Sequence, residues 1–132
     1  MTISDAEFLE QFEAKTLNPG YFNHQGHLRL AWLFLNKYDL EVAIEKVTTG
    51  ISAYATNLGA TGKFKHTLTE AIVRIIARRM ETQRFGELES FLASNNDLVT
   101  NIWGVVNQHY TEERLNSDLA ISQFVEPDRL PI

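Results

Sequence analysis

The apolar residues of this chain recur at the spacing of α-helices. The clearest case is a stripe of six residues at intervals of 4, 3, 4, 3 and 4: Leu40, Ile44, Val47, Ile51, Tyr54 and Leu58. This spacing places all six on one face of a helix, and Gly59 directly after them favours its end. No segment alternates apolar and polar residues convincingly, so no β-strand is predicted.

The same pattern, together with helix start signals, predicts five further helices. The six predicted segments run from residue 5 to before residue 18, then over about 24–37, 40–58, 64–83, 85–93 and 97–110. Ser4 and Glu7 have the spacing of a capping box for the first helix, and Asn23 is the predicted N-cap of the second. Proline, the strongest helix breaker, stands only at positions 19, 127 and 131. Residues 1–132 are therefore predicted to form a single all-α domain, a compact bundle of five to six helices.

The C-terminal residues 111–132 follow a different pattern. Their apolar residues are few and scattered: Leu115, Ile121, Phe124, Val125 and Leu130. We expect an extended C-terminal tail that packs on the bundle, because these residues offer apolar anchors. A frayed terminus is the alternative.

Composition and charge exclude several classes of function. The 132 residues include no cysteine, which removes thiol catalysis, disulfides and cysteine-type zinc sites. Twelve Lys and Arg stand against seventeen Asp and Glu, a formal net charge of −5, so no nucleic-acid partner is expected. The longest apolar run, residues 30–35, is far shorter than the roughly 20 residues of a membrane span. No secretory signal is visible at the start, and the expectation is a soluble, cytoplasmic protein with no membrane partner.

Two histidines lie in the first turn of the predicted helix 24–37. Laid out at about 100° per residue, this helix is apolar nearly all round, and His24 and His27 flank the centre of its buried face. Imidazoles three residues apart point the same way and can share a metal ion or an anion. The positive end of the helix dipole attracts anions to the same turn and favours the neutral imidazole. The alternative is that both histidines bind the backbone and serve packing.

A lysine is the unexpected residue of the predicted helix 64–83. On a helical wheel Lys65 lies at the centre of the inward face, with Thr69 one turn beyond it. A buried lysine needs a matching charge or a lowered pKa. Thr67 and Glu70, however, have the spacing of a capping box. If the helix begins there, Lys65 and His66 belong to the preceding loop, and Lys65 is a snorkelling side chain.

His66 and Glu70 have the i,i+4 spacing of a ligand pair on a helix, which the wheel tests. It places Glu70 on the solvent side of the helix and His66 at the border, so no ligand pair is expected from them. Three further charged residues are expected on the same solvated face: Arg74, Arg78 and Glu81.

Four segments of the chain carry a resemblance to a known family. Residues 22–32 contain F-x-H-x-x-H-L-R-x-A-W, residues 67–69 read T-L-T, residues 110–115 read Y-T-E-E-R-L, and V-E-P-D lies within residues 125–131. In that order they resemble a family of small uncharacterised bacterial all-helical proteins with this signature, a Y-H-x-T-[LI]-T segment and a W-V-E-P-D-L-x-P-L-P tail. The resemblance implies a site of three histidines on two helices. His24 and His27 match two of them, whereas Lys65 occupies the third position and His66 is one residue out of phase.

These observations predict a pocket between the second and fourth helices that takes a small anionic ligand. His24 and His27 would bind or protonate the ligand, Lys65 would supply the counter-charge, and the tail would act as a lid. Three further hydroxyls are predicted to line the pocket: Thr69, Tyr38 and Tyr54. Such a site could support an acid/base enzyme, or a metal-assisted one in which His24, His27 and His66 hold a divalent metal.

The competing prediction is a non-catalytic helical module that binds a partner or forms a homodimer, with structural histidines. Tyr38 and Tyr54 would then be core residues with one satisfied hydrogen bond. In either case His109 is expected to be structural, and the two tryptophans, Trp32 and Trp103, are expected to pack in the interior.

Overall fold

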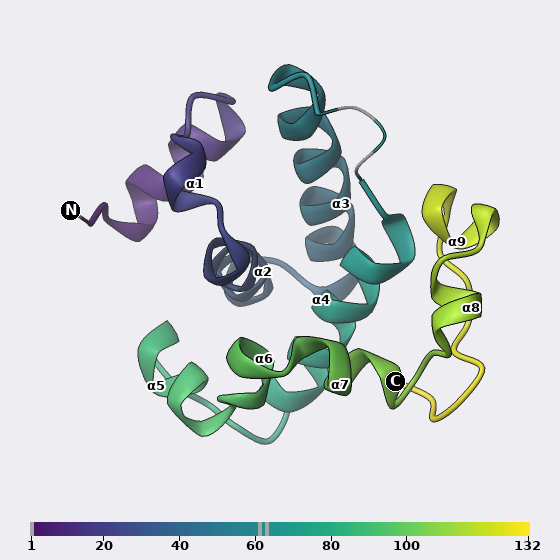
Figure 1. Cartoon of the computed structure of the whole chain (residues 1–132). Coiled ribbons are helices and arrows are strands. Elements are labelled where there is room, and N and C mark those ends of the chain that lie inside the picture. The colour runs from purple at the N-terminus through teal and green to yellow at the C-terminus, as the bar shows by residue number, and fades with distance from the viewer. Residues whose placement is uncertain (1, 61, 63) are drawn as a thin grey trace. The chain divides into compact units, whose positions relative to one another are not determined.

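A computed structural model describes residues 2–60, 62 and 64–132 (Figure 1). All regular elements of this described part are helical, which confirms the all-α prediction. Five of its helices have seven residues or more, within the predicted five to six. The chain divides into two compact units, unit 1 (Met1–Phe64) and unit 2 (Lys65–Ile132), which are described in turn. The prediction of a single domain stays a prediction.

Unit 1 contains three α-helices and one 3₁₀ turn. They are α1 (Asp5–Glu13), η1 (Pro19–Tyr21), α2 (His24–Lys37) and α3 (Leu40–Asn57). The predicted capping box forms at α1, where Ser4 and Glu7 exchange hydrogen bonds, and Asn23 caps α2 by accepting from the Gly26 amide. Helix α3 packs against both α2 and α1.

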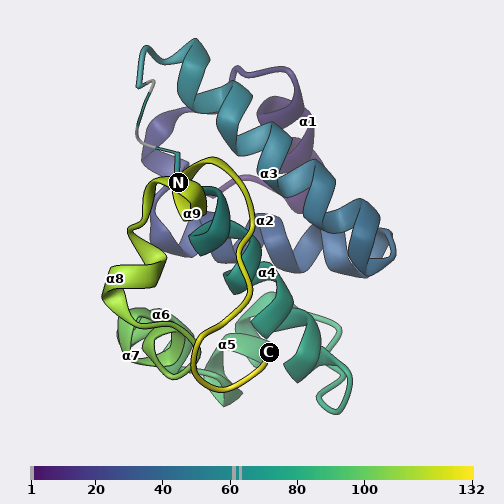
Figure 2. The same ribbon diagram turned by 90° about the vertical axis from the view of Figure 1, so that its right-hand side faces the viewer.

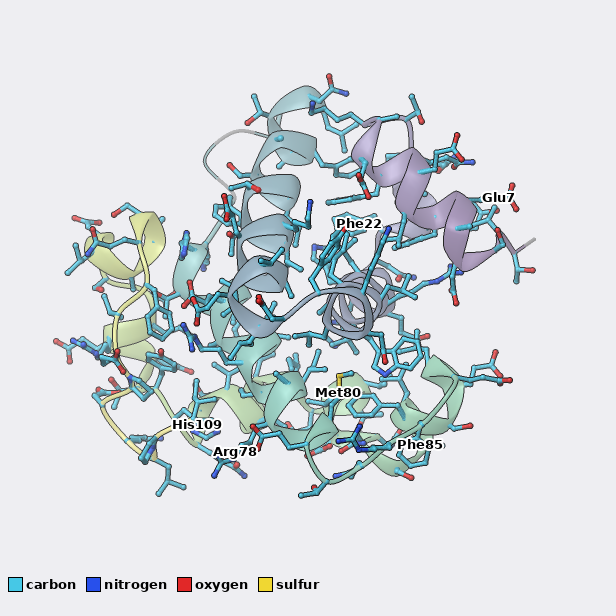
Figure 3. All side chains as sticks on the ribbon, turned by 180° about the vertical axis from the view of Figure 1, so that it is seen from behind. Glu7, Phe22, Arg78, Met80, Phe85 and His109 are labelled. Atoms are coloured by element: carbon cyan, nitrogen blue, oxygen red, sulfur yellow. The ribbon has the colours of Figure 1, made fainter. Side chains whose placement is uncertain are left out.

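Four rings form an aromatic cluster (Phe12, Phe22, His27 and Tyr54) within unit 1. Phe22, just before α2, contributes the central ring, which Figure 3 labels. Its ring centroid lies 5.3 Å from that of Phe12 on α1, 5.0 Å from that of Tyr54 on α3 and 4.1 Å from that of His27 on α2. The start of α2 is therefore held against the other two helices of the unit, α1 and α3.

Unit 2 is built around one long helix and several short ones. They are α4 (His66–Met80), α5 (Leu88–Ser94), α6 (Asp97–Thr100), α7 (Ile102–Asn107), α8 (Glu112–Leu115) and α9 (Asp118–Ser122). Helix α4 packs against α9 and α7. Within the described residues, no helix combines the length and apolar character that a bilayer crossing needs.

The predicted helix 97–110 is interrupted in the structure. It divides into α6 and α7 at Asn101, whose backbone leaves the helical region at φ −146° and ψ 47°. The Asn101 side chain occupies the space where a Cβ on Gly104 would stand. A short amide side chain competes with the helix for backbone groups, and the glycine one turn later leaves it room.

The predicted tail is extended over a shorter stretch than expected. Residues 111–122 form α8 and α9, which begin at the side-chain caps Thr111 and Ser117. The extended part is residues 123–132, here called the tail, and its course is yellow in Figure 2.

The first half of the tail is anchored to a buried threonine and a buried tyrosine. The Thr67 hydroxyl donates to the Gln123 carbonyl over 2.8 Å and accepts from the Val125 amide over 3.1 Å. The Tyr110 hydroxyl donates to the Val125 carbonyl over 2.6 Å. Thr67 and Tyr110 are both 0% exposed, so these bonds form away from water.

The second half of the tail is bound at the end of α7. Asp128 accepts hydrogen bonds from both the amide and the hydroxyl of Thr111. The Leu130 carbonyl lies 2.8 Å from Nδ1 of His109, and the Arg129 amide donates to the His109 carbonyl. His109 thus has the structural contact expected of it.

Candidate functional site

The histidine best placed for chemistry is His27, in the first turn of α2. Its Nδ1 lies 2.8 Å from the backbone carbonyl oxygen of Asn23. A carbonyl can only accept, so Nδ1 carries the hydrogen of this bond. In the neutral ring the lone pair is then on Nε2, the atom that would take a proton or bind a ligand.

The surroundings of His27 favour this neutral form. Its ring stacks on Phe22 with an interplanar angle of 25°. Burial lowers the pKa of His27 below its usual value of 6.5, and the nearby charge of His24 lowers it further, against the opposing effect of the Asn23 carbonyl. An imidazole with a lowered pKa is a free base at neutral pH.

The Nε2 atom of His27 keeps a surface open to solvent. Within the described residues it has no hydrogen-bond partner, and the one buried side-chain polar atom without a partner there is Oδ1 of Asn107. Because Nε2 is not among the buried unpaired atoms, it is not completely shielded from solvent. The predicted pair of His24 and His27 is thus found in one turn of one helix, and Nε2 of His27 is the proton-accepting atom.

The lowered pKa of His27 predicts a pH-dependent stability. The unfolded chain binds more protons than the folded one just below pH 6.5, so the free energy of unfolding falls as the pH drops through that value. We expect urea denaturation from about pH 7 to about pH 5 to show this loss, and His27→Gln to reduce the slope. Ring resonances of His27 that titrate above 6.5 would contradict the prediction.

Of the two tyrosines predicted to line the pocket, Tyr54 belongs to the aromatic cluster of His27, whereas Tyr38 lies at the other end of α2. Tyr54 is 3% exposed, and its hydroxyl donates to the Leu17 carbonyl over 2.7 Å. Burial raises the pKa of Tyr54, so the hydroxyl stays protonated. Tyr38 follows the last residue of α2, and its half-buried ring lies under the ammonium group of Lys46, 4.9 Å from the ring centroid.

The other predicted site residues belong to unit 2. Lys65 is the N-cap of α4 with extended backbone, so it precedes the helix, and the wheel does not place it on the inward face. Its Nζ donates to Oδ1 of Asn116 over 3.2 Å. The helix begins at His66, and Thr69 lies half-buried in its first turn. The capping box predicted from Thr67 is absent, because the Thr67 hydroxyl binds the tail.

The prediction that Glu70 faces solvent is wrong. Glu70 is 6% exposed, and its carboxylate lies 3.1 Å from Nε2 of His66 and 2.9 Å from Nε of Arg74. Arg74 in turn covers the ring of Phe124 in the tail, 4.9 Å from the centroid. Phe124 of the tail therefore packs on the face that the wheel left to water, and α9 also packs on α4. Arg78 and Glu81 are exposed, as predicted.

The buried carboxylate influences a neighbouring hydroxyl. Burial, with added repulsion from Glu126 and Glu70, raises the pKa of Tyr110 to about 12. Tyr110 therefore holds its proton at any physiological pH and donates it steadily to the tail. The hydrogen bond from Tyr110 to the tail is therefore kept over this pH range.

The three histidines predicted to hold a metal ion lie in different units of the chain. His24 and His27 lie in unit 1, whereas His66 lies in unit 2 with its Nε2 directed at Glu70. In the part of the chain that the structure describes, no group of three His, Asp or Glu side chains is arranged to hold a metal ion.

Comparison with known proteins finds no significant match. No family model matches this chain. No curated protein and no solved structure matches it significantly. Any function must therefore be argued from the geometry of the side chains.

One residue of the His27 site was missed by the sequence reasoning, namely Gly26. A Cβ added there would collide with the backbone carbonyl oxygen of Tyr21. Only glycine lets the η1 turn lie directly against the first turn of α2. A glycine inside an otherwise apolar helix was the available signal for such a close approach.

Proposed function

We propose that the protein is an acid/base enzyme acting on a small anionic molecule, with His27 as the proton acceptor. The observation that carries the proposal is the hydrogen bond from Nδ1 to the Asn23 carbonyl, which leaves the lone pair of the neutral ring on Nε2. Catalytic and metal-bound histidines commonly have this arrangement, in which a backbone carbonyl fixes the tautomer. The carbonyl also stabilises the imidazolium that forms when Nε2 takes a proton.

We infer that the ligand is anionic because both histidines lie at the N-terminal end of a helix. The first turn of α2 presents the positive end of a 14-residue helix dipole. His24 is close enough for its charge to lower the pKa of His27. It provides a second imidazole that can donate a hydrogen bond to an anion. The family resemblance at positions 22–32 includes both histidines and implies that they belong to one site. The role of Lys65 as counter-charge stays a prediction from the sequence.

A second candidate function is a non-catalytic module that binds a partner or a second copy of the chain. It is favoured by Trp103, whose side chain is 56% exposed on α7, contrary to the prediction that it packs inside. Large exposed aromatic residues are enriched where proteins bind each other.

Titration of the histidine ring resonances with inorganic phosphate and with acetate distinguishes the two candidates. For the enzyme we expect the His24 and His27 signals to shift, and the pKa of His27 to rise because a bound anion stabilises imidazolium. His27→Gln should abolish the binding, while the matched variant His109→Gln, whose ring binds the tail, should leave it unchanged. The proposal would be overturned if neither anion shifted the histidine resonances and His27→Gln lost stability. The histidines would then be structural.

A further inference from the structure

A hydrogen bond and an aromatic stack both act on the imidazole ring of His27. The hydrogen bond to the Asn23 carbonyl is exposed to solvent, so water competes for both of its groups. The same carbonyl also accepts from the backbone amide of His27 over 3.0 Å, so it is shared between two donors. The χ2 torsion of a histidine has broad minima, and a shared, exposed bond restricts its rotation only weakly.

The stack on Phe22 restricts this rotation further. The centroids of the two rings lie 4.1 Å apart and their planes differ by 25°, so the rings are nearly parallel and in contact. Rotation of the imidazole about χ2 would turn its edge into the face of the Phe22 ring. The imidazole therefore keeps the plane in which Nδ1 meets the Asn23 carbonyl.

Phe22 is itself fixed by the other rings of the aromatic cluster. Its ring is tilted by 40° against that of Phe12 and meets that of Tyr54 edge-on at 71°. The ring of Tyr54 is buried, and its hydroxyl is bonded to the Leu17 carbonyl. The imidazole thus stacks on a ring that has little freedom to move.

The backbone before α2 brings Phe22 to this position. Phe22 is the C-cap of η1, and its Cδ1 atom lies 3.5 Å from the place where a Cβ on Gly26 would stand. The missing side chain at Gly26 lets η1 lie against the first turn of α2. This close approach places the Phe22 ring beside the turn that carries His27.

We propose that Phe22 is a positioning residue that selects the tautomer of His27 with the hydrogen on Nδ1 and the lone pair on Nε2. The inference rests on the proposed function, in which Nε2 accepts the proton. A neutral imidazole can carry its hydrogen on either nitrogen, and Nε2 accepts a proton only while Nδ1 carries that hydrogen. Without the stack, the ring rotates away from the carbonyl and Nε2 carries the hydrogen for part of the time.

Nitrogen-15 chemical shifts of the His27 ring test the proposal, because they differ between the two tautomers. They are recorded without ligand at about pH 8, where the ring is neutral. In Phe22→Leu we expect the ratio of the Nδ1-protonated to the Nε2-protonated form to fall about threefold or more, as for the loss of one aromatic pair. Phe22→Met replaces this variant if circular dichroism shows Phe22→Leu to be unfolded.

Two further variants separate positioning from packing. Phe22→Tyr keeps the ring and should keep the original ratio. Phe34→Leu removes a ring of the same helix that is 2% exposed and contacts Tyr38 instead of the cluster. It should lower the stability of the fold and leave the ratio unchanged.

Two results would overturn the proposal. An unchanged ratio in the folded Phe22→Leu or Phe22→Met variant would mean that the hydrogen bond alone fixes the ring. An equal fall in Phe34→Leu would mean that the ratio responds to any loosening of unit 1. Because the ratio is measured without ligand, it tests the role of Phe22 whether or not phosphate and acetate shift the histidine resonances.

Discussion

Replacing Gly26 with alanine is expected to destabilise the protein by about 3 kcal/mol, a large effect for one methyl group. The new Cβ would overlap the backbone carbonyl oxygen of Tyr21, and a backbone oxygen cannot rotate away as a side chain can. Relief requires the η1 turn to move away from α2, which pulls Phe22 from the aromatic cluster. Urea denaturation measures the loss, and the ring resonances of His27 should shift in the same variant.

The matched control for Gly26→Ala is Gly86→Ala. Nothing lies within 4 Å of the place where a Cβ on Gly86 would stand, so this variant should match the original within about 0.5 kcal/mol. Equal stabilities for the two variants would show that the η1 turn and α2 are not in close contact.

Replacing Thr67 with valine is expected to cost about 2 kcal/mol and to release the first half of the tail. Valine has the same shape but no hydroxyl, so the Gln123 carbonyl and the Val125 amide both lose their partner. Thr67 is 0% exposed, and water cannot easily replace the lost bonds. Hydrogen exchange should accelerate at the Val125 amide, together with a lower unfolding midpoint.

Two variants check that the lost hydroxyl is the cause. Thr67→Ser keeps the hydroxyl and should retain protection at Val125, at a smaller cost from the missing methyl group. Thr100→Val removes an exposed hydroxyl that binds only a carbonyl of its own turn, and it should leave the tail protected. A protected Val125 amide in Thr67→Val would contradict the anchoring role.

The helices of unit 1 were predictable because their signals are local. The predicted helix 24–37 has the observed bounds of α2, since Asn23 caps its start and the apolar run ends at Leu35, two residues before the last helical residue. The bond between His27 and the Asn23 carbonyl also spans a single helical turn. The half of the candidate site that lies in α2 was therefore accessible from sequence.

The features of unit 2 that were missed depend on residues distant in the chain. Glu70 is buried because the tail and α9 cover it from about fifty residues away in sequence. A helical wheel assumes that one face of a helix is buried. Helix α4 packs against α9, α7 and the tail, so more than one of its faces is covered. Two placements of Lys65 stayed open in the sequence, because a shift of one residue in the helix start decides whether the wheel applies to it at all.

The contacts of the tail have a consequence for the order in which the chain folds during synthesis. All residues of unit 1 have been made once Phe64 has left the ribosome. Thr67 and Tyr110 of unit 2 cannot form their hydrogen bonds to the tail until Gln123 and Val125 have been made. The part of a chain that is made first generally folds first, so contacts within unit 1 can form before those of unit 2 are complete. During that interval the hydroxyls that later bind the tail are satisfied by water, and the emerging tail displaces it.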